Sequence, residues 1–235
     1  MAAAGKPMMP FWVAFALIAV GGGLVIARLA MKGSPPLTTE TVAPLASGPR
    51  GVTMGPDSAK VEIMEFSDFE CPYCGRFAVL SMPDIKARLM PTGKVRWRFV
   101  NFPLTGHTKS PYAHLAASCA NEQGRFWEMH DLIYQNQGDW TEASNPLKDL
   151  EGYARQAGVP DMARYESCVS ERRTWGSVLA DKALGDSIGL GGTPTFFVNG
   201  RQLPGTPSVD ELLRIADSLS APAGSPAAGR ARASR

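Results

Sequence analysis

The sequence predicts an α/β domain with an all-helical insertion, preceded by one N-terminal transmembrane helix. Residues 60–66 and 95–100 alternate between apolar and polar side chains, as β-strands do. Residues 110–187 carry apolar side chains mostly at helical spacing, and residues 8–27 carry no charge at all. Strands and helices in this order are typical of an α/β fold.

The uncharged N-terminal run is long enough to cross a bilayer, which takes about 20 apolar residues. We expect a membrane anchor over residues 1–32. A cleaved signal peptide is the alternative, although the run is long for one and no small-x-small cleavage site follows it. A buried core helix is the third interpretation, but the run has no polar face. Lys6 on one side and Arg28 and Lys32 on the other leave its orientation undecided by charge.

Three further segments follow the anchor. Residues 33–50 are rich in Pro, Ser, Thr and Ala and predict a flexible linker, and residues 221–235 predict a disordered tail. Residues 51–220 have the size of one domain. The formal net charge of the chain is only +2, which gives no electrostatic reason to expect a nucleic acid partner.

The domain is predicted to have strands toward both ends, helices between them and a last helix after the final strand. The pattern predicts a helix over residues 71–90, interrupted or kinked at Pro83. Four amphipathic segments then make up most of a helical insertion at about residues 108–188. Residues 195–198 predict a strand, Asn199-Gly200 a hairpin turn, residues 201–203 the return strand, and residues 209–219 a last helix.

A Cys-x-x-Cys pair stands where the first long strand gives way to the first helix. Pro72 suits the first helical turn, and Cys71 and Cys74 share one helix face, so their sulfurs can reach each other. The free N–H groups and dipole at a helix N-terminus favour a thiolate at Cys71. The pair therefore indicates thiol-disulfide chemistry, which needs no metal or organic cofactor.

Two other interpretations of this pair remain. Zinc usually needs a second close pair of Cys or His, and the sequence offers none, so we expect no metal. A purely structural Cys71–Cys74 disulfide would close too short a loop to stabilise the fold much.

The segment 65–74 (EFSDFECPYC) resembles the active-site signature of the DsbA-type thioredoxin-fold oxidoreductases, especially their membrane-anchored bacterial branch. Together with its further matches, the resemblance covers about residues 51–219. Those matches are residues 101–104 (NFPL), 117–120 (ASCA), 124–127 (GRFW) and 191–200 (GGTPTFFVNG).

The resemblance implies a role for each matching residue. Cys71 would be the nucleophile, Cys74 the resolving thiol, and Glu65 a buried acid that exchanges a proton with Cys74. Glu65 shares a strand face with apolar Ile63, which favours that role over an ordinary solvent-facing residue. The residues implied to contact substrate are Thr193, a cis-proline at Pro194, Pro72 and Tyr73.

The resemblance further implies an enzyme that introduces disulfides into secreted or envelope proteins from the cell membrane, facing the periplasm or extracytoplasmic space. Its partners would be reduced secreted proteins and a membrane quinone-linked thiol oxidase. Tyr73 departs from the histidine often found there, so oxidising strength is open, and a reductase or isomerase is the alternative. A redox-inactive peptide-binding chaperone is a second alternative.

The remaining cysteines and histidines lie outside that motif. We expect Cys119 and Cys168 to form a structural disulfide, with two buried thiols as the alternative. His107, His114 and His130 form no ligand motif. His130 shares a helix face with apolar residues and is expected to be packed.

Overall fold

The computed structural model describes residues 50–221, and the predicted anchor, nearly all of the linker and nearly all of the tail lie outside these residues. No helix in the described range is long and apolar enough to span a bilayer.

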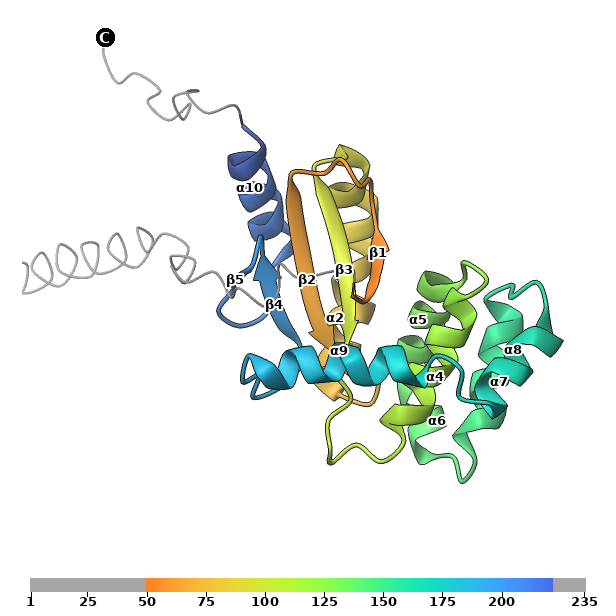
Figure 1. Cartoon of the computed structure of the whole chain (residues 1–235). Helices are drawn as coiled ribbons and strands as arrows, with labels where there is room; N and C mark the ends of the chain where they lie inside the picture. The colour runs from red at the N-terminus through yellow and green to blue at the C-terminus, as the bar shows by residue number, and fades with distance from the viewer. Residues whose placement is uncertain (1–49, 222–235) are drawn as a thin grey trace, which may run out of the picture. The chain divides into compact units, whose positions relative to one another are not determined.

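A five-stranded sheet in the order β1-β3-β2-β4-β5 forms the centre of the described domain (Figure 1). Its strands are β1 (Val52–Met54), β2 (Val61–Ser67), β3 (Val95–Asn101), β4 (Thr195–Val198) and β5 (Arg201–Gln202). The β2–β3 pair is parallel, and the other pairs are antiparallel. A parallel pair requires a crossover, and the helical segment between β2 and β3 provides it.

The side chains of β2 point alternately to the two faces of the sheet, and different helices cover each face. Val61 and Ile63 are fully buried beneath α2 (Pro72–Leu80), the π-helical turn η2 (Ile85–Leu89) and α10 (Val209–Ser220). Phe66 points to the opposite face, where it packs with residues of α9 (Trp175–Ser187).

The predicted helix over residues 71–90 is interrupted, but at Ser81 rather than at Pro83. It begins at Pro72, with Cys71 as the N-cap residue, and α2 ends at Leu80. The short α3 (Met82–Asp84) follows, then η2 and the 3₁₀ turn η3 (Met90–Thr92). Pro83 stands in the first turn of α3, where a missing N–H leaves no helical bond unmade, so the proline begins a new helix instead of kinking an old one.

A helical subdomain lies between β3 and β4 in the chain (Figure 1). Its apolar cluster also includes Cys71, Cys74 and Phe99, so it is continuous with the elements that carry the cysteine pair. The subdomain includes one short helix, α6, that the sequence pattern did not predict. Its members before α9 are α4 (Ser110–Asn121), α5 (Phe126–Gln135), α6 (Gln137–Glu142), α7 (Pro146–Gln156) and α8 (Met162–Ser170).

The predicted hairpin at Asn199-Gly200 is confirmed. Asn199 has φ 46° and Gly200 has φ 78°, the two positive values that a type I′ turn requires. The return strand ends at Gln202, one residue earlier than predicted. The N–H of Leu203 still donates a hydrogen bond to the carbonyl oxygen of Phe196, at an ordinary distance of 2.8 Å.

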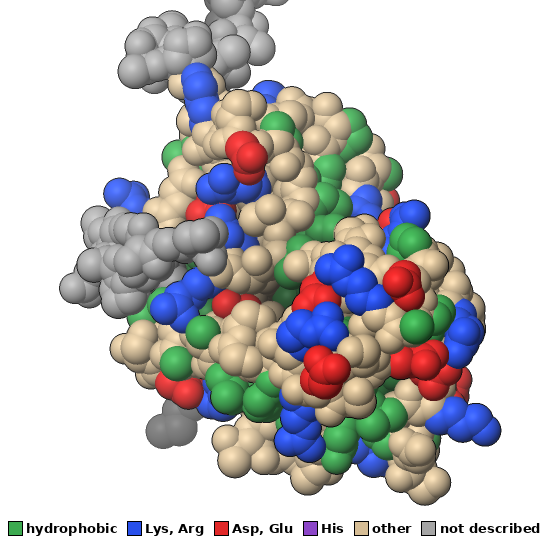
Figure 2. Space-filling model, turned by 45° about the vertical axis from the view of Figure 1, so that its right-hand side comes forward, with side chains coloured by type: hydrophobic (Ala, Val, Ile, Leu, Met, Phe, Trp, Pro, Cys, Tyr) green, Lys and Arg blue, Asp and Glu red, His purple; other side chains and the backbone are tan. Residues whose placement is uncertain are grey.

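Basic and acidic side chains are interspersed over the face shown in Figure 2 and do not gather by sign. Exposed basic side chains of the described domain also form ion pairs; Arg155, for example, contacts both Glu151 and Glu166. That face therefore presents no large field of one sign.

Candidate active site

The two cysteines of the Cys-x-x-Cys pair lie at the N-terminus of α2 as free thiols. Cys71 is 4% exposed and Cys74 is fully buried. The Cys71 thiol donates to the carbonyl oxygen of Thr193 at 3.3 Å, and the Cys74 sulfur accepts from the N–H of Asp68 at 3.5 Å. Cys71 is thus the less buried of the two cysteines.

The structure gives the two thiols opposite acidities. A hydrogen bond from the Cys74 thiol is the largest influence on Cys71, and it lowers the pKa of Cys71 to about 5 despite burial. The Thr193 side chain and the N–H groups of the first helical turn act in the same direction. Burial raises the pKa of Cys74 well above its usual value. The asymmetry therefore favours loss of the proton from Cys71 over loss of the proton from Cys74.

The Thr193–Pro194 peptide bond is cis. Both residues are half-buried, and the carbonyl of Thr193 lies against the Cys71 sulfur. Tyr73, in contrast, is 71% exposed beside Cys71. Of the four residues that the resemblance assigned to substrate contact, Thr193 thus contacts the Cys71 sulfur, Pro194 follows it through the cis bond, and Pro72 and Tyr73 follow Cys71 in the chain.

Glu65 is fully buried in β2, beside the fully buried Ile63. Its Oε2 accepts a hydrogen bond from the Trp97 indole at 3.1 Å, while Oε1 has no hydrogen-bond partner among the described residues. Burial is the largest influence on this carboxyl, and it raises the pKa of Glu65 to about 7. Such a group can both take up and release a proton at neutral pH.

Cys119 and Cys168 form a disulfide that joins α4 to α8. Both residues are fully buried in the core of the helical subdomain, on helices that carry neither active-site cysteine.

Comparison with known proteins agrees with this geometry. The family described as thioredoxin matches residues 47–218. The chain belongs to the thioredoxin family. The resemblance drawn from the sequence is confirmed for this thioredoxin domain, while the membrane anchor stays a prediction.

Two relatives and one solved structure are similar to this chain. The "Probable disulfide bond formation protein D" of Bacillus anthracis is 29% identical over 70% of this chain and 76% of its own length. A region of the "Na(+)/H(+) antiporter NhaA 3" of Salinispora tropica is 38% identical over 67% of this chain, but the chain spans only 23% of that relative. The crystal structure of Chlamydia trachomatis DsbA shares the fold, with a TM-score of 0.64 and 21% identity over 79% of this chain and 97% of that one.

Asp68, which no sequence pattern marked as a site residue, is fully buried three residues before Cys71. One carboxylate oxygen accepts from the N–H of Leu104 at 2.8 Å and contacts the ring of His107 at 2.7 Å. The other accepts from the Ser110 hydroxyl and from the N–H of Glu70. Burial alone would raise the pKa of Asp68, but His114, Ser110 and Leu104 together hold it well below its usual range.

Two further side chains hold the turn before Cys71. The Glu70 carboxylate accepts from the N–H groups of Lys109 and Ser110, at the start of α4. The Gln137 amide of α6 donates to the carbonyl oxygens of Phe69 and Cys71 at 2.7 and 3.0 Å. Helices of the insertion thus position the catalytic turn of the thioredoxin unit.

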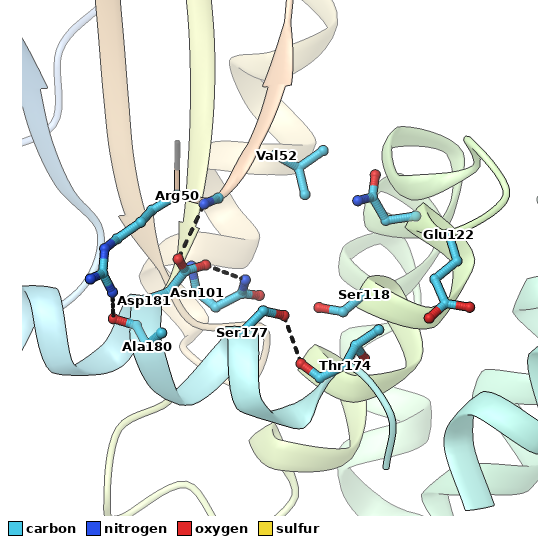
Figure 3. A pocket seen from close by; sticks show the side chains of 11 residues that line it. Arg50, Val52, Asn101, Ser118, Glu122, Thr174, Ser177, Ala180 and Asp181 are labelled. Carbon is cyan, nitrogen blue, oxygen red and sulfur yellow. Dashed lines mark hydrogen bonds between the residues drawn. The ribbon is translucent and has the colours of Figure 1, made fainter. Parts of the chain in front are cut away.

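A cavity of about 500 Å³ lies between the start of β1 and helices α4 and α9, and neither active-site cysteine lines it (Figure 3). At its base, Asp181 accepts from the Asn101 amide at 2.7 Å and from the N–H of Gly51 at 3.1 Å. Asn101 in turn accepts from His114 Nδ1 at 2.8 Å, and His114 Nε2 lies 3.8 Å from Asp68. A buried polar chain therefore links this cavity to the catalytic turn.

The three histidines lie in two environments, the aromatic core and the surroundings of Asp68. His130 is fully buried among aromatic rings, which confirms that it is packed, and burial lowers its pKa. His107 and His114 instead lie against Asp68. They come 39 and 46 residues after Asp68 in the chain, so no local motif could have linked them to it.

Proposed function

We propose that this protein is a thiol-disulfide oxidoreductase that introduces disulfides into secreted or envelope proteins by dithiol-disulfide exchange. The observation that carries the proposal is the pairing of an acidic Cys71, the less buried of the two, with a fully buried, weakly acidic Cys74 at one helix N-terminus. Exchange requires this asymmetry, because one sulfur must receive the attack and the other must leave.

The proposed reaction begins when a substrate thiolate attacks the Cys71 sulfur of the oxidised enzyme. The Cys71–Cys74 bond breaks, and a mixed disulfide forms between substrate and Cys71. The Thr193 carbonyl, which lies against Cys71, offers a backbone acceptor to the incoming peptide. A second substrate thiolate then attacks the mixed disulfide, leaving an oxidised substrate and a reduced enzyme.

The acidity of Cys71 supports the oxidising direction. With a pKa of about 5, its thiolate stabilises the reduced enzyme at pH 7 by about 3 kcal/mol relative to a thiol that stays protonated. For a two-electron couple this raises the reduction potential by roughly 60 mV. This increase in reduction potential does not depend on a histidine at position 73, where this chain has a tyrosine.

We place the catalytic domain outside the cytoplasm, held at the cell membrane by the segment of residues 8–27. Two features support this location. The Cys119–Cys168 disulfide is typical of oxidising compartments, and the relative from Bacillus anthracis is named as a disulfide bond formation protein. A membrane quinone-linked thiol oxidase would then reoxidise Cys71 and Cys74.

The first test is the reduction potential of the Cys71/Cys74 pair, measured in the full chain by equilibration with glutathione buffers. A value near −120 mV, at the oxidising end of the known range, is the expected result. A value near −270 mV, as in thioredoxin, would reverse the direction and identify a reductase.

A cellular assay separates the remaining alternatives. Cys71→Ser should abolish disulfide formation in a secreted reporter protein. Full function of that variant would overturn the enzymatic proposal in favour of a redox-inactive peptide-binding chaperone. Isomerase activity would appear as repair of a scrambled disulfide protein by the reduced chain.

A further inference from the structure

The sulfur of Cys74 gains the charge that is released when the active-site disulfide opens. An incoming thiolate attacks Cys71, and the electron pair of the broken S–S bond goes to Cys74. Cys74 is fully buried, and burial raises the pKa of its thiol well above the usual value. Opening therefore depends on protein groups that can stabilise a thiolate at this position.

One such group is the N–H of Asp68, which donates to the Cys74 sulfur at 3.5 Å. Burial raises the pKa of Cys74, and this hydrogen bond opposes that effect. The carbonyl oxygen of Asp68 accepts from the N–H of Cys71 at 3.1 Å. The backbone of Asp68 thus contacts both cysteines, with its donor directed at the sulfur that becomes charged.

The peptide bond between Ser67 and Asp68 is held at both ends. The carbonyl oxygen of Ser67 accepts from the N–H of Phe102 at 2.9 Å, just past the end of β3. This peptide bond is trans, so its N–H points away from that carbonyl and toward Cys74. The Ser67 hydroxyl also lies 2.9 Å from the hydroxyl of Tyr134 in α5. The end of β2 therefore helps to set the direction of the N–H.

The side chain of Asp68 restrains the same residue from the other side. One carboxylate oxygen accepts from the N–H of Glu70 at 2.9 Å and from the Ser110 hydroxyl. The other accepts from the N–H of Leu104 at 2.8 Å and contacts the ring of His107. Because the side chain is fully buried and both of its oxygens are engaged, the backbone of Asp68 has little freedom to rotate.

The charge of Asp68 has the opposite effect on exchange. Burial would raise its pKa, but His114 and the hydrogen bonds hold it well below the usual range, so the side chain is a carboxylate. A buried carboxylate disfavours a second negative charge nearby. Removal of the charge alone would therefore ease thiolate formation on Cys74, whereas loss of the directed N–H would hinder it. The two effects differ in sign and can be distinguished by experiment.

We propose that the N–H of Asp68 stabilises the thiolate that forms on Cys74 during exchange, and that the Asp68 side chain is the positioning group that directs it. This inference deepens the proposed function and rests on its exchange chemistry, in either direction of electron flow. A substrate thiolate bonds to the Cys71 sulfur, the Cys71–Cys74 bond breaks, and the electron pair stays on Cys74, which accepts the N–H. No proton is transferred in this step. In the reverse step the Cys74 thiolate attacks Cys71 in the mixed disulfide and releases the substrate thiolate.

The test is a stopped-flow measurement of how fast glutathione opens the Cys71–Cys74 disulfide of the oxidised full chain at pH 7. Asp68→Ala should slow opening by about tenfold, as expected for one hydrogen bond to a charged group. Asp68→Asn loses the charge but keeps an oxygen for the N–H of Glu70, so it should open no more than about threefold slower than the wild type. Asp68→Ala opening at the wild-type rate or faster would overturn the proposal, and so would Asp68→Asn opening as slowly as Asp68→Ala.

Ser110→Ala tests the same positioning without changing a charge or Asp68 itself. It removes one donor to the carboxylate and should slow opening by about threefold, and an unchanged rate would contradict the role of the side chain. If Asp68→Ala does not fold, this variant carries the test. Asp161→Ala removes an exposed cap of α8 and is the matched control, which should open at the wild-type rate. Urea unfolding of each variant checks that it is folded.

A step in which Cys74 takes no part separates this role from general damage to the site. In a Cys74→Ser background, Cys71 forms a mixed disulfide with glutathione, and a second glutathione thiolate then releases it. Asp68→Ala should change that rate by less than about twofold, since Cys74 is not the leaving group. Equal slowing of both reactions would identify a purely structural effect and reject the proposal. The reduction potential of the wild type tests the proposed oxidising direction separately, because a reductase would show the same rate ratios.

Discussion

Glu65 is a carboxyl group buried completely in a strand, and its ionisation has a direct effect on stability. Burial raises its pKa in the folded protein to about 7, from 4.5 in an exposed chain. Between these values the folded state holds a proton that the unfolded state has lost. The unfolding free energy therefore falls as pH rises from 4.5 to 7, and it stays lowered above pH 7.

Glu65→Gln should remove this pH dependence. In the oxidised protein, where the cysteines do not titrate, the variant should gain about 3 kcal/mol relative to the wild type between pH 4 and pH 8, at 1.36 kcal/mol per pH unit. Urea unfolding at both values measures the difference. Stability curves of the two proteins that run parallel from pH 4 to 8 would show that Glu65 ionises as freely as in the unfolded chain.

Some residues of the candidate site could be predicted from the sequence and others could not. The positions of Cys71, Cys74 and Glu65 could be predicted because they lie within ten residues, with Glu65 in a strand and the cysteines at the start of the helix that follows it. Tyr134 and His114 could not, since each reaches the site from a helix of the insertion. Their contacts depend on tertiary packing, which leaves no local period in the sequence.

At the scale of elements, the turn from β2 to α2 depends on Asp68. Its carboxylate accepts from two backbone N–H groups and one hydroxyl and contacts His107, and it thereby ties the turn to the segment that leads into α4. Every one of these partners would be left unpaired by truncation of the side chain.

Asp68→Ala should therefore lower the unfolding free energy by about 3 kcal/mol, because buried donors lose their acceptor. Asp161→Ala is the matched control. Asp161 is an exposed N-cap of α8 whose side chain accepts from the N–H of Arg164, and its loss should cost about 1 kcal/mol. Equal losses in urea unfolding of the two variants would mean that the Asp68 contacts contribute no more than an ordinary cap.

Long helices and strands could be predicted from the sequence more readily than short ones. Both seven-residue strands show their alternation clearly, but β1 has only three residues, too few to display a period. The break at Ser81 was displaced from the prediction because Pro83 is compatible with a first helical turn as well as with a kink.

At the scale of the whole molecule, the Cys119–Cys168 disulfide closes a loop across the helical subdomain, with a sequence separation of 49. In the chain-entropy model a loop of this size stabilises the folded state by about 4 kcal/mol. Because the bridge includes neither Cys71 nor Cys74, we expect it to stabilise the fold and to take no part in thiol exchange.

Replacing both residues by alanine should lower the unfolding free energy by about 4 kcal/mol in urea unfolding of the oxidised chain. In the variant with Cys71 and Cys74 reduced, the pH dependence of Cys71 alkylation should keep its midpoint near pH 5. The groups that lower the pKa of Cys71 are not part of the bridge. A shifted midpoint would contradict this separation and would assign the bridge an influence on the active site.

The amide of Gln137 has a consequence for protein engineering. It reaches from the insertion to two carbonyl groups of the catalytic turn, and Gly75 leaves the room it needs, since a Cβ there would lie 2.5 Å from the Gln137 side chain. A minimal enzyme made by excising the insertion would lose this amide together with Tyr134 and His114. The insertion is therefore part of the smallest unit that could be transplanted with its redox properties intact.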